Sequence, residues 1–206
     1  MKEEKLSLYK TKKRKLKRKP LKLNLQSLLF IFLINSISNE LYSEIHLIIS
    51  GIGVQEVLNH EFNPGHIEVF VNGVKNSSCT LSCYMEEDTN SITLRFYDQI
   101  VSCKNMFNSL RNLVEIDLSD FDSSQVTDME LMFYGCSSLK KANFGIINTS
   151  SLEKMNNLFR ECSALTTVNL LNIDTSKVKT MEYLFYGCTQ LKSIDISNFD
   201  LSKVNK

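Results

Sequence analysis

The residues best suited to chemistry are six cysteines and three histidines. Cys79 and Cys83 form a close pair with Cys103 further along, and thiols of this kind can ligate zinc together with histidine. A second close pair is absent, and the histidines, His46, His60 and His66, have no ligand-like spacing. We therefore predict no metal site. We expect one disulfide among the three cysteines, and the spacing leaves its connectivity open.

A second group of cysteines recurs at a fixed step. Cys136, Cys162 and Cys188 lie 26 residues apart, and Leu110 stands one step before them. A ladder of thiols would suit metal or redox chemistry, but replacement by leucine indicates a position that needs only a small apolar side chain. We predict buried free cysteines here.

Catalytic patterns are missing from the rest of the sequence. No Ser/His/Asp or Cys/His arrangement has a known catalytic spacing, and histidine is absent after His66. Gly51 and Gly53 follow a strand-like run, but a phosphate loop needs a third glycine, so we predict a turn into a short helix over residues 51–58. The sequence predicts no enzyme, no catalytic residue and no cofactor.

The elements that position these residues come from an internal repeat. Four phenylalanines and four leucines each recur every 26 residues: Phe107, Phe133, Phe159 and Phe185, and Leu113, Leu139, Leu165 and Leu191. We predict four copies over residues 103–128, 129–154, 155–180 and 181–206, with these columns forming a continuous apolar core when the copies stack.

Each copy has its own local pattern. Leu113, Ile116 and Leu118 match a short strand, and residues 129–136 contain good helix formers ended by glycine. Between them lies a turn with Asp or Asn followed two residues later by serine, and these side-chain oxygens can accept hydrogen bonds from the turn amides. The predicted fold class is an α/β repeat: a leucine-rich-repeat-like solenoid with short parallel strands and short helical turns, behind a small β-rich region.

Three stretches of sequence carry a resemblance to a known family. Residues 115–129, 132–140 and 193–204 resemble the 26-residue repeat of BspA-like leucine-rich-repeat surface proteins, which occur in bacteria, mycoplasmas and protists. The resemblance covers residues 103–206, about half of the chain. It implies a solenoid displayed outside the cell whose usual role is adhesion or ligand binding, and it carries over no catalytic motif.

The region before the repeats has a β pattern. Residues 45–49, 67–71 and 92–97 read as strands, and Asn72 with Gly73 suits a tight hairpin turn because both tolerate positive φ. We assign residues 39–102 to a β-rich N-terminal or capping region, whose fold the sequence leaves open.

The first 38 residues differ in composition from the rest. A basic block over residues 10–19 precedes an apolar run over residues 28–34, and Ser36 and Ser38 supply a small-residue cleavage pattern. We predict a secretory signal peptide, and whether it is cleaved stays open. The competing interpretation is a nuclear-localisation or nucleic-acid-binding patch, retained as the basic tail of an intracellular repeat scaffold.

Charge weighs against that alternative. The formal net charge is +1, from 24 Lys and Arg against 23 Asp and Glu, but residues 1–38 carry +9 and residues 39–206 carry −8. An acidic body is a poor nucleic-acid binder, so we expect no nucleic-acid partner.

The candidate binding face is the outward side of the predicted strands. Its eight residues are Glu115, Asp117, Lys141, Asn143, Thr167, Asn169, Ser193 and Asp195. We expect a protein or glycan partner at the cell surface, although the uniform Asp/Asn column also fits a merely solubilising surface. Asn76 and Asn148 begin N-glycosylation sequons, and burial of Asn148 would block its modification.

Two further expectations concern the C-terminal end of the sequence. The fourth copy carries no polar cap, which suggests self-association through its stacking face or a fragment of a larger surface protein. Contact with a membrane is expected only through the leader or through an anchor further downstream.

Overall fold

The computed structural model describes residues 42–205, and the predicted signal peptide therefore lies outside the described residues. Strands are the regular elements of this part. They are β1 (Ser43–Ser50), β2 (Gly53–Glu56), β3 (Ile67–Val71), β4 (Val74–Lys75), β5 (Ser82–Met85), β6 (Thr89–Phe96), β7 (Leu113–Asp117), β8 (Lys141–Asn143) and β9 (Thr167–Asn169).

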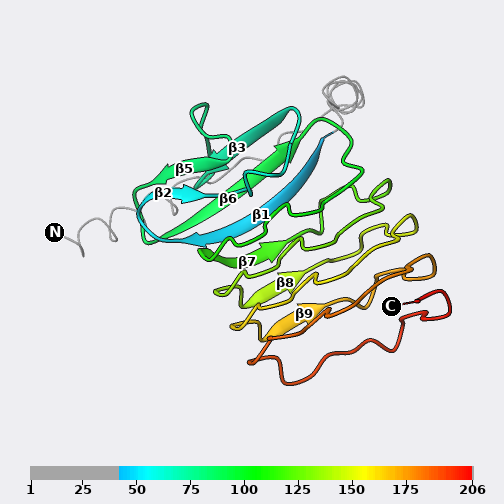
Figure 1. Ribbon diagram of the computed structural model, residues 1–206. Helices are drawn as coiled ribbons and strands as arrows, with labels where there is room; N and C mark the ends of the chain where they lie inside the picture. Colours follow the sequence, from blue (N-terminus) through cyan, green and yellow to red (C-terminus); the bar gives the residue numbers. More distant parts are fainter. Residues whose placement is uncertain (1–41, 206) are drawn as a thin grey trace, which may run out of the picture. The chain divides into compact units, whose positions relative to one another are not determined.

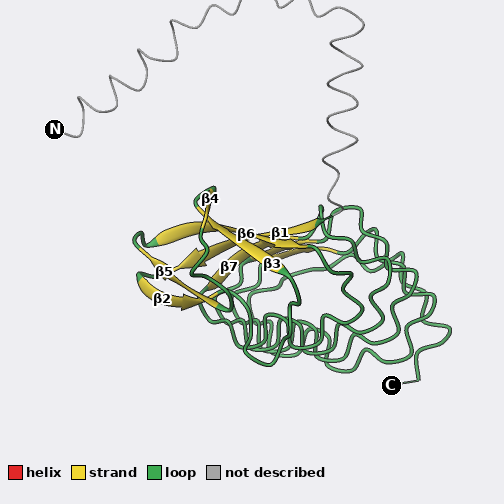
Figure 2. Cartoon of the chain, turned by 90° about the horizontal axis from the view of Figure 1, so that it is seen from above, coloured by secondary structure: helices red, strands yellow, loops and turns green. Residues whose placement is uncertain are grey.

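One large sheet joins both parts of the sequence. Its seven strands follow the order β4-β3-β6-β1-β7-β8-β9, so β1 lies between the N-terminal strand β6 and the first repeat strand β7 (Figure 1). The β1 strand is antiparallel to both neighbours, whereas β7, β8 and β9 are parallel and in register. A separate two-stranded sheet pairs β2 with β5. Figure 2 shows the strands of the large sheet on one side and the loops of the copies on the other.

The predicted fold class, an α/β solenoid with short helical turns, is wrong. Residues 42–205 are all-β and contain no helix, and their strands form a mixed seven-stranded sheet with a small second sheet. The β-rich N-terminal region supplies four strands of the same sheet to which the copies contribute three.

The error lies in the segment over residues 129–136. Leu131 and Gly135 have positive φ angles of 59° and 68°, which a right-handed helix does not contain. The N–H groups of Leu131 and Phe133 donate to the carbonyls of Asn156 and Leu158 in the next copy, each at 3.0 Å. Intervening amides donate three residues back, so the segment is a chain of tight turns. The equivalent positive-φ positions are Asn105 and Ser109, Asn157 and Glu161, and Tyr183 and Gly187.

The short helix predicted over residues 51–58 is also absent. Gly51 and Gly53 have positive φ angles of 107° and 80°, and the chain turns there directly into β2. The predicted hairpin turn is confirmed, because Asn72 and Gly73 have φ angles of 51° and 79° between the paired strands β3 and β4.

A column of stacked phenylalanines runs through the core of the copies. The ring centroids of Phe107, Phe133, Phe159 and Phe185 follow one another at 5.5, 5.2 and 5.6 Å, with nearly parallel planes. The first three rings are buried and Phe185 is half-buried. The leucine column behaves alike: Leu113, Leu139 and Leu165 are buried and Leu191 is half-buried.

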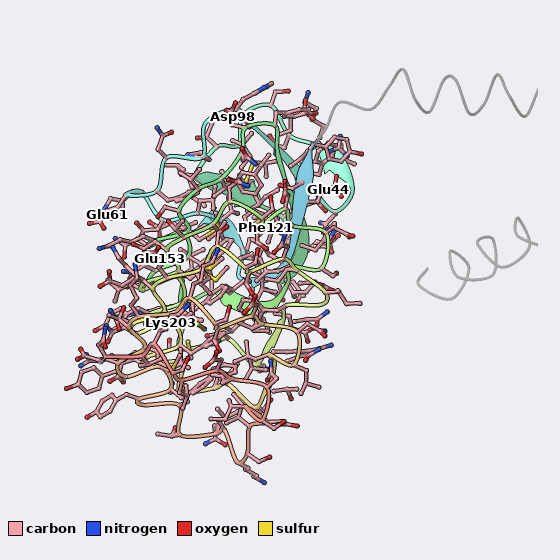
Figure 3. The ribbon with its side chains drawn as sticks, turned by 90° about the vertical axis from the view of Figure 1, so that its right-hand side faces the viewer. Glu44, Glu61, Asp98, Phe121, Glu153 and Lys203 are labelled. Atoms are coloured by element: carbon pink, nitrogen blue, oxygen red, sulfur yellow. A yellow bond between two sulfur atoms is a disulfide. The ribbon has the colours of Figure 1, made fainter. Side chains whose placement is uncertain are left out.

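An aromatic contact joins this core to the N-terminal strands. Phe121 of the first copy, labelled in Figure 3, packs edge to face against Phe96 of β6, and the two ring centroids are 6.2 Å apart. Both side chains are buried, so the two parts of the chain share one hydrophobic core.

The predicted polar turns are confirmed. Side chains of Asp122, Asn148, Asp174 and Asp200 each accept a hydrogen bond from the N–H two residues on, at 2.9–3.1 Å. Buried hydroxyls between them donate to the next copy: Ser123 to the Asn148 carbonyl, Thr149 to that of Asp174 and Thr175 to that of Asp200. The first set of bonds satisfies backbone amides within the turns, and the second set links each copy to the next.

The phenylalanine column should dominate the stability of the copies. Phe133→Ala removes a buried ring that contacts Phe107, Phe144 and Phe159, so we expect a loss of about 3–5 kcal/mol in the free energy of unfolding. Chemical denaturation followed by circular dichroism measures it. The control is Ile146→Ala, because Ile146 is 87% exposed and its truncation should cost less than about 0.5 kcal/mol. Equal losses in the two variants would contradict a shared phenylalanine core.

Candidate binding face

One side of the large sheet is open, and its outward side chains form rows that cross the strands. Alternation along β1 and β6 buries one set of residues and leaves the other partly exposed. Strand register then aligns the outward positions. One row contains Phe70, Thr93, His46, Asp117, Asn143 and Asn169; another contains Ser91, Ile48, Glu115, Lys141 and Thr167.

Six of the eight predicted face residues occupy these two rows. Glu115, Lys141 and Thr167 are exposed on adjacent strands, and Asp117, Asn143 and Asn169 are half-buried beside them. Ser193 and Asp195 of the fourth copy are also exposed, but they lie outside the strands. The structure therefore brings together the predicted residues of the first three copies.

The uniform Asp/Asn column has a local structural role. Oδ1 of Asp117, Asn143, Asn169 and Asp195 each accepts a hydrogen bond from the N–H two residues further on, at 2.9–3.2 Å. This Asx turn bends the chain away at the end of the strand. The column is thus required by the backbone, which neither the binding nor the solubilising interpretation anticipated.

Asp117 is the most heavily bonded member of that column. Partial burial opposes its ionisation, but the Ser119 hydroxyl and N–H and the Asn143 amide all donate to its carboxylate, so its pKa is lowered. His46 also lies close enough to favour the charged form. At neutral pH a negative charge therefore lies near the middle of the face.

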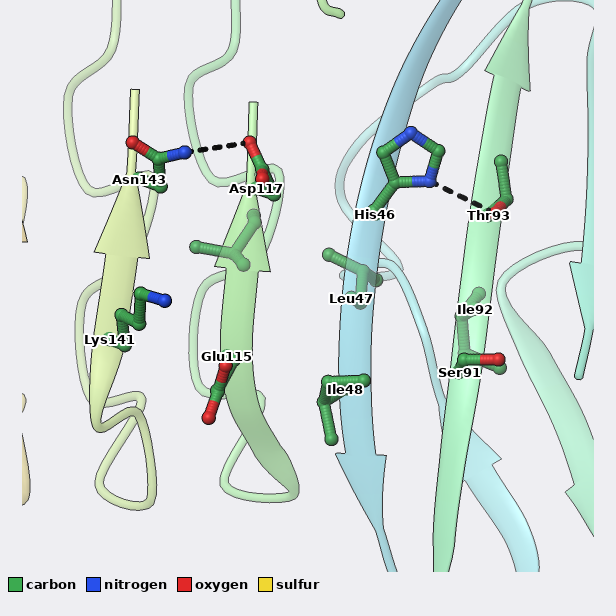
Figure 4. Close-up of a pocket in the computed structure, with 11 residues that line it drawn as sticks. His46, Leu47, Ile48, Ser91, Ile92, Thr93, Glu115, Asp117, Lys141 and Asn143 are labelled. Carbon is green, nitrogen blue, oxygen red and sulfur yellow. Dashed lines mark hydrogen bonds between the residues drawn. The ribbon is translucent and has the colours of Figure 1, made fainter. Parts of the chain in front are cut away.

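A hollow of about 200 Å³ lies on the open face, bordered by β6, β1, β7 and β8 (Figure 4). His46, Thr93, Asp117 and Asn143 cross one end of it, and Ser91, Ile48, Glu115 and Lys141 cross the other. The buried side chains of Leu47, Ile92 and Ile116 complete its lining. The hollow is thus an open depression whose lining is mainly apolar, with polar and charged side chains at its two ends.

His46 of β1 contacts β6 and the loop that follows β7 at one end of the hollow. Its Nδ1 lies 3.1 Å from the Thr93 hydroxyl, and its Nε2 lies 3.4 Å from the Asp120 carboxylate and 3.8 Å from that of Glu44. The imidazole therefore links the N-terminal strands to the first copy, and it faces acidic groups on both.

Beyond the hollow the face carries a paired charge cluster. The Arg95 guanidinium donates to Glu44 at 2.7 and 2.8 Å and lies 3.7 Å from Glu68. Its central carbon sits 4.2 Å from the Tyr42 ring centroid and 4.6 Å from that of Phe70, on which the cation stacks. A hydrogen bond from Lys75 lowers the pKa of Glu68, and so does one from the Tyr97 hydroxyl. These charges satisfy one another.

Sequence reasoning missed the half of the face that β1 and β6 supply. The alternation over residues 43–50 and 89–96 marks His46, Ile48, Ser91 and Thr93 as outward positions. The alternation does not show which strand of the repeats pairs with β1. Only the pairing of β1 with β7 places those four residues beside Glu115 and Asp117.

The cysteines form two groups, as the sequence predicted: one disulfide pair and a set of free thiols. The structure also identifies which two cysteines form the disulfide. Cys79 and Cys83 form a disulfide, while Cys103, Cys136 and Cys162 are buried and free and Cys188 is free and half-buried. In the repeated column each thiol donates to a carbonyl one copy back, Cys136 to Phe107, Cys162 to Phe133 and Cys188 to Phe159, at 3.0 Å. The column is therefore a structural element.

Neither sequon is closed off by burial. Asn76 is half-buried and its Oδ1 accepts hydrogen bonds from the N–H and hydroxyl of Ser78. Asn148 is exposed, contrary to the concern that it might be buried, and its Oδ1 accepts the Ser150 N–H. Both amides remain candidates for glycosylation.

Within residues 42–205, no three His, Cys, Asp or Glu side chains are grouped so that they could hold a metal ion. No helix in that part of the chain is long and apolar enough to cross a membrane.

Fold and face together define a class: an all-β protein in which 26-residue copies extend one open sheet. The chain belongs to the family described as "Mycoplasma protein of unknown function, DUF285", whose family model matches residues 101–206. No curated protein and no solved structure matches the chain. The family description assigns no activity.

The carboxylate of Asp117 should stabilise the fold only while it is ionised. Because its folded-state pKa is lowered, this stabilisation is present above the unfolded value of about 3.9 and is lost as the pH falls through the folded value. We expect Asp117→Asn to unfold about 0.5–1 kcal/mol more easily at pH 7, and we expect this difference to shrink as the pH is lowered below about 3.9. Chemical denaturation at pH 7 and at a series of lower pH values checks this. Asp88→Asn, at a carboxylate without a hydrogen bond to residues 42–205, should show no such difference.

The thiol column predicts graded protection from alkylation. Burial raises the pKa of Cys136 to about 12 and that of Cys188 to about 11, and it also raises the pKa of Cys162 and Cys103. Because only the thiolate reacts and a buried thiol must first be exposed, iodoacetamide at pH 8 should label the half-buried Cys188 before the buried Cys136. Peptide mass spectrometry of native and urea-unfolded protein measures the order. Uniform labelling of the native protein would contradict the burial of the column.

Proposed function

We propose that the protein is a non-enzymatic binding protein of the cell exterior whose open sheet face, with the hollow at its centre, contacts a macromolecular partner. The observation that carries the proposal is the continuity of the face. One outward row runs from β3 to β9 and a second from β6 to β9, and both cross the join between the N-terminal strands and the copies; the register shift in the β1–β7 pairing, between Ile48 and Ile49, lies beyond both rows.

The chemistry of the face favours binding of a partner. Around the hollow, Glu115 and Lys141 make no ion pair with residues 42–205, whereas Arg95, Glu44, Glu68 and Lys75 are paired with each other. Unpaired polar groups on a rigid sheet are free to bond a partner without first breaking internal bonds. The size of the hollow, about 200 Å³, suits one residue or sugar of a larger molecule.

Three features support a location outside the cell. The Cys79–Cys83 disulfide is typical of oxidising compartments, and the leader pattern of residues 1–38 precedes the folded part. The sequence also resembles BspA-like leucine-rich-repeat surface proteins over residues 103–206, and the family match is consistent with that resemblance. Under this proposal the protein is secreted or surface-displayed and acts in adhesion.

The alternatives come from the same sequence. An intracellular repeat scaffold would retain the basic tail, and its N-terminal peptide would be intact from Met1 in cytosolic or nuclear fractions. A larger surface protein of which this chain is a piece would keep the same face, and a longer transcript would reveal it.

Protease shaving of intact cells tests display. Cells producing the full chain with a C-terminal tag should lose the tag to externally added protease, while a cytosolic marker survives. Mass spectrometry of the purified N-terminus should find a start after residue 38. A tag that is released only after cell lysis would overturn the surface location.

Site-specific crosslinking tests the face. A photo-crosslinking amino acid at Thr93 or Lys141, on two strands bordering the hollow, should give the same discrete adduct on intact cells. The matched control is Tyr84, which is exposed on the small two-stranded sheet and should give no such adduct. Adducts at Tyr84 alone, or equal adducts at all three positions, would overturn the proposed face while leaving the question of display unaffected.

A further inference from the structure

The hollow on the open sheet face is acidic at one end and balanced in charge at the other. Asp117 lines the acidic end, and the Asp120 carboxylate lies close by, 3.4 Å from Nε2 of His46. At the other end Glu115 and Lys141, which are opposite each other on β7 and β8, carry charges of opposite sign. A positively charged group of a partner is therefore attracted to the end at which Asp117 lies.

One oxygen of the Asp117 carboxylate has no hydrogen-bond donor among residues 42–205. The Ser119 N–H, the Ser119 hydroxyl and the Asn143 amide all donate to Oδ1, and none of these residues donates to Oδ2. The side chain is half-buried and is ionised at neutral pH. A half-buried carboxylate oxygen of this kind favours a cationic donor that a partner supplies.

The bonding of the other oxygen distinguishes between the two basic side chains. Arginine binds a carboxylate best as a fork, with parallel N–H bonds to both oxygens. Because Oδ1 of Asp117 already accepts bonds from Ser119 and Asn143, a fork would have to displace one of them. Lysine ends in a compact ammonium, which can donate to Oδ2 alone. The bonding pattern therefore favours lysine.

The rest of the hollow suits the stem of a lysine side chain. Its lining is mainly apolar, and the rows at its two ends lie two residues apart along each strand, which is about 6.5 Å. A lysine stem has a similar reach and packs well on apolar surface. Sugar hydroxyls would lose hydrogen bonds to water over such a lining, and no Phe or Tyr lines the hollow to carry a sugar ring. The lining therefore favours an alkyl chain over a glycan.

We infer that the hollow binds a lysine side chain presented by a protein partner. This inference rests on the binding face proposed above and names what occupies its hollow. The ammonium donates to Oδ2 of Asp117, and the stem crosses the hollow toward Glu115 and Lys141, which lie at the opposite end in Figure 4. The rest of the partner then lies over the row that contains Glu115 and Lys141.

Nuclear magnetic resonance of the isotope-labelled full chain measures the interaction. The probe is an acetylated and amidated Gly-Lys-Gly peptide, and its matched controls carry norleucine, Nε-acetyl-lysine or arginine in place of lysine. The lysine peptide should shift the amide signals of Thr93, Asp117 and Asn143 saturably. The norleucine and acetyl-lysine peptides keep the stem but lack the charge, so they should bind at least about tenfold more weakly. The arginine peptide should have an intermediate affinity.

Asp117→Asn removes the charge and keeps the Asx turn, because Asn143 and Asn169 make the same turn in the same column. This variant should bind the lysine and norleucine peptides about equally. The matched control is Asp174→Asn, which alters an Asx-turn carboxylate away from the hollow and should retain the full preference for lysine. Thermal melts verify that both variants are folded. Should Asp117→Asn fail to fold, the four peptides with the unsubstituted protein carry the test.

Several outcomes would overturn the inference. Equal affinity for the lysine and norleucine peptides would remove the ammonium from the interaction, and an unchanged preference in folded Asp117→Asn would place the ammonium elsewhere. Tighter binding of the arginine peptide would overturn the choice of lysine. Shifts of the same amide signals by chitotriose, but not by the lysine peptide, would make the hollow a glycan site.

The crosslinking experiment at Thr93 and Lys141 keeps this inference separable from the proposed function. A discrete adduct on intact cells together with equal binding of the lysine and norleucine peptides would retain the binding face and overturn the lysine. A preference for the lysine peptide without any adduct would support the chemistry of the hollow and overturn the role of the face on cells.

Discussion

The structure depends on the hydrogen bonds that the backbone of each copy makes to the next one. Residues 129–136 illustrate the constraint, because they form neither helix nor strand and still have to satisfy their amides. Alternate N–H groups donate to the following copy, and the remainder close tight turns within the segment. This alternation holds only if consecutive copies are aligned residue for residue. The 26-residue step, the phenylalanine column and the cysteine column follow from that alignment.

The requirement that backbone groups be hydrogen-bonded also explains the role of the N-terminal strands. A stack of copies presents unpaired strand groups at its first member, and exposed edges of this kind promote uncontrolled association. Here β1 pairs with β7 along the first copy, and the Glu44 N–H donates to the Asp120 carbonyl at 3.0 Å. Phe96 and Phe121 continue the core across the same join. Because these N-terminal strands belong to the same sheet as β7, β8 and β9, the open face extends past the first copy.

The 26-residue spacing correctly predicted the core residues and the polar turns. It did not predict the backbone conformation of the segments between them. The spacing of Phe133 or Asp122 suffices to assign each to its column, since stacking places each column on itself. Helix propensity failed at Leu131 because its positive φ is imposed by bonds to the next copy, which local sequence does not encode. Half of the candidate face was missed for a related reason. The pairing of β1 with β7 joins positions about 70 residues apart, and no local pattern reports such a contact.

Some positions of the face can hold many types of side chain, whereas others cannot. This difference determines which positions can make the face specific for one partner. The column of Asp117, Asn143 and Asn169 ends each strand with an Asx turn, so only residues that can accept that hydrogen bond fit there. The adjacent column makes no such bond, and it contains Glu115, Lys141 and Thr167, three unrelated side chains on nearly identical backbones. Ser91 and Ile48 extend that column onto β6 and β1 without repeating it. A partner that distinguishes this chain from another protein built on the same repeat must therefore read the row from Ser91 to Thr167, because the neighbouring row is largely fixed by the fold.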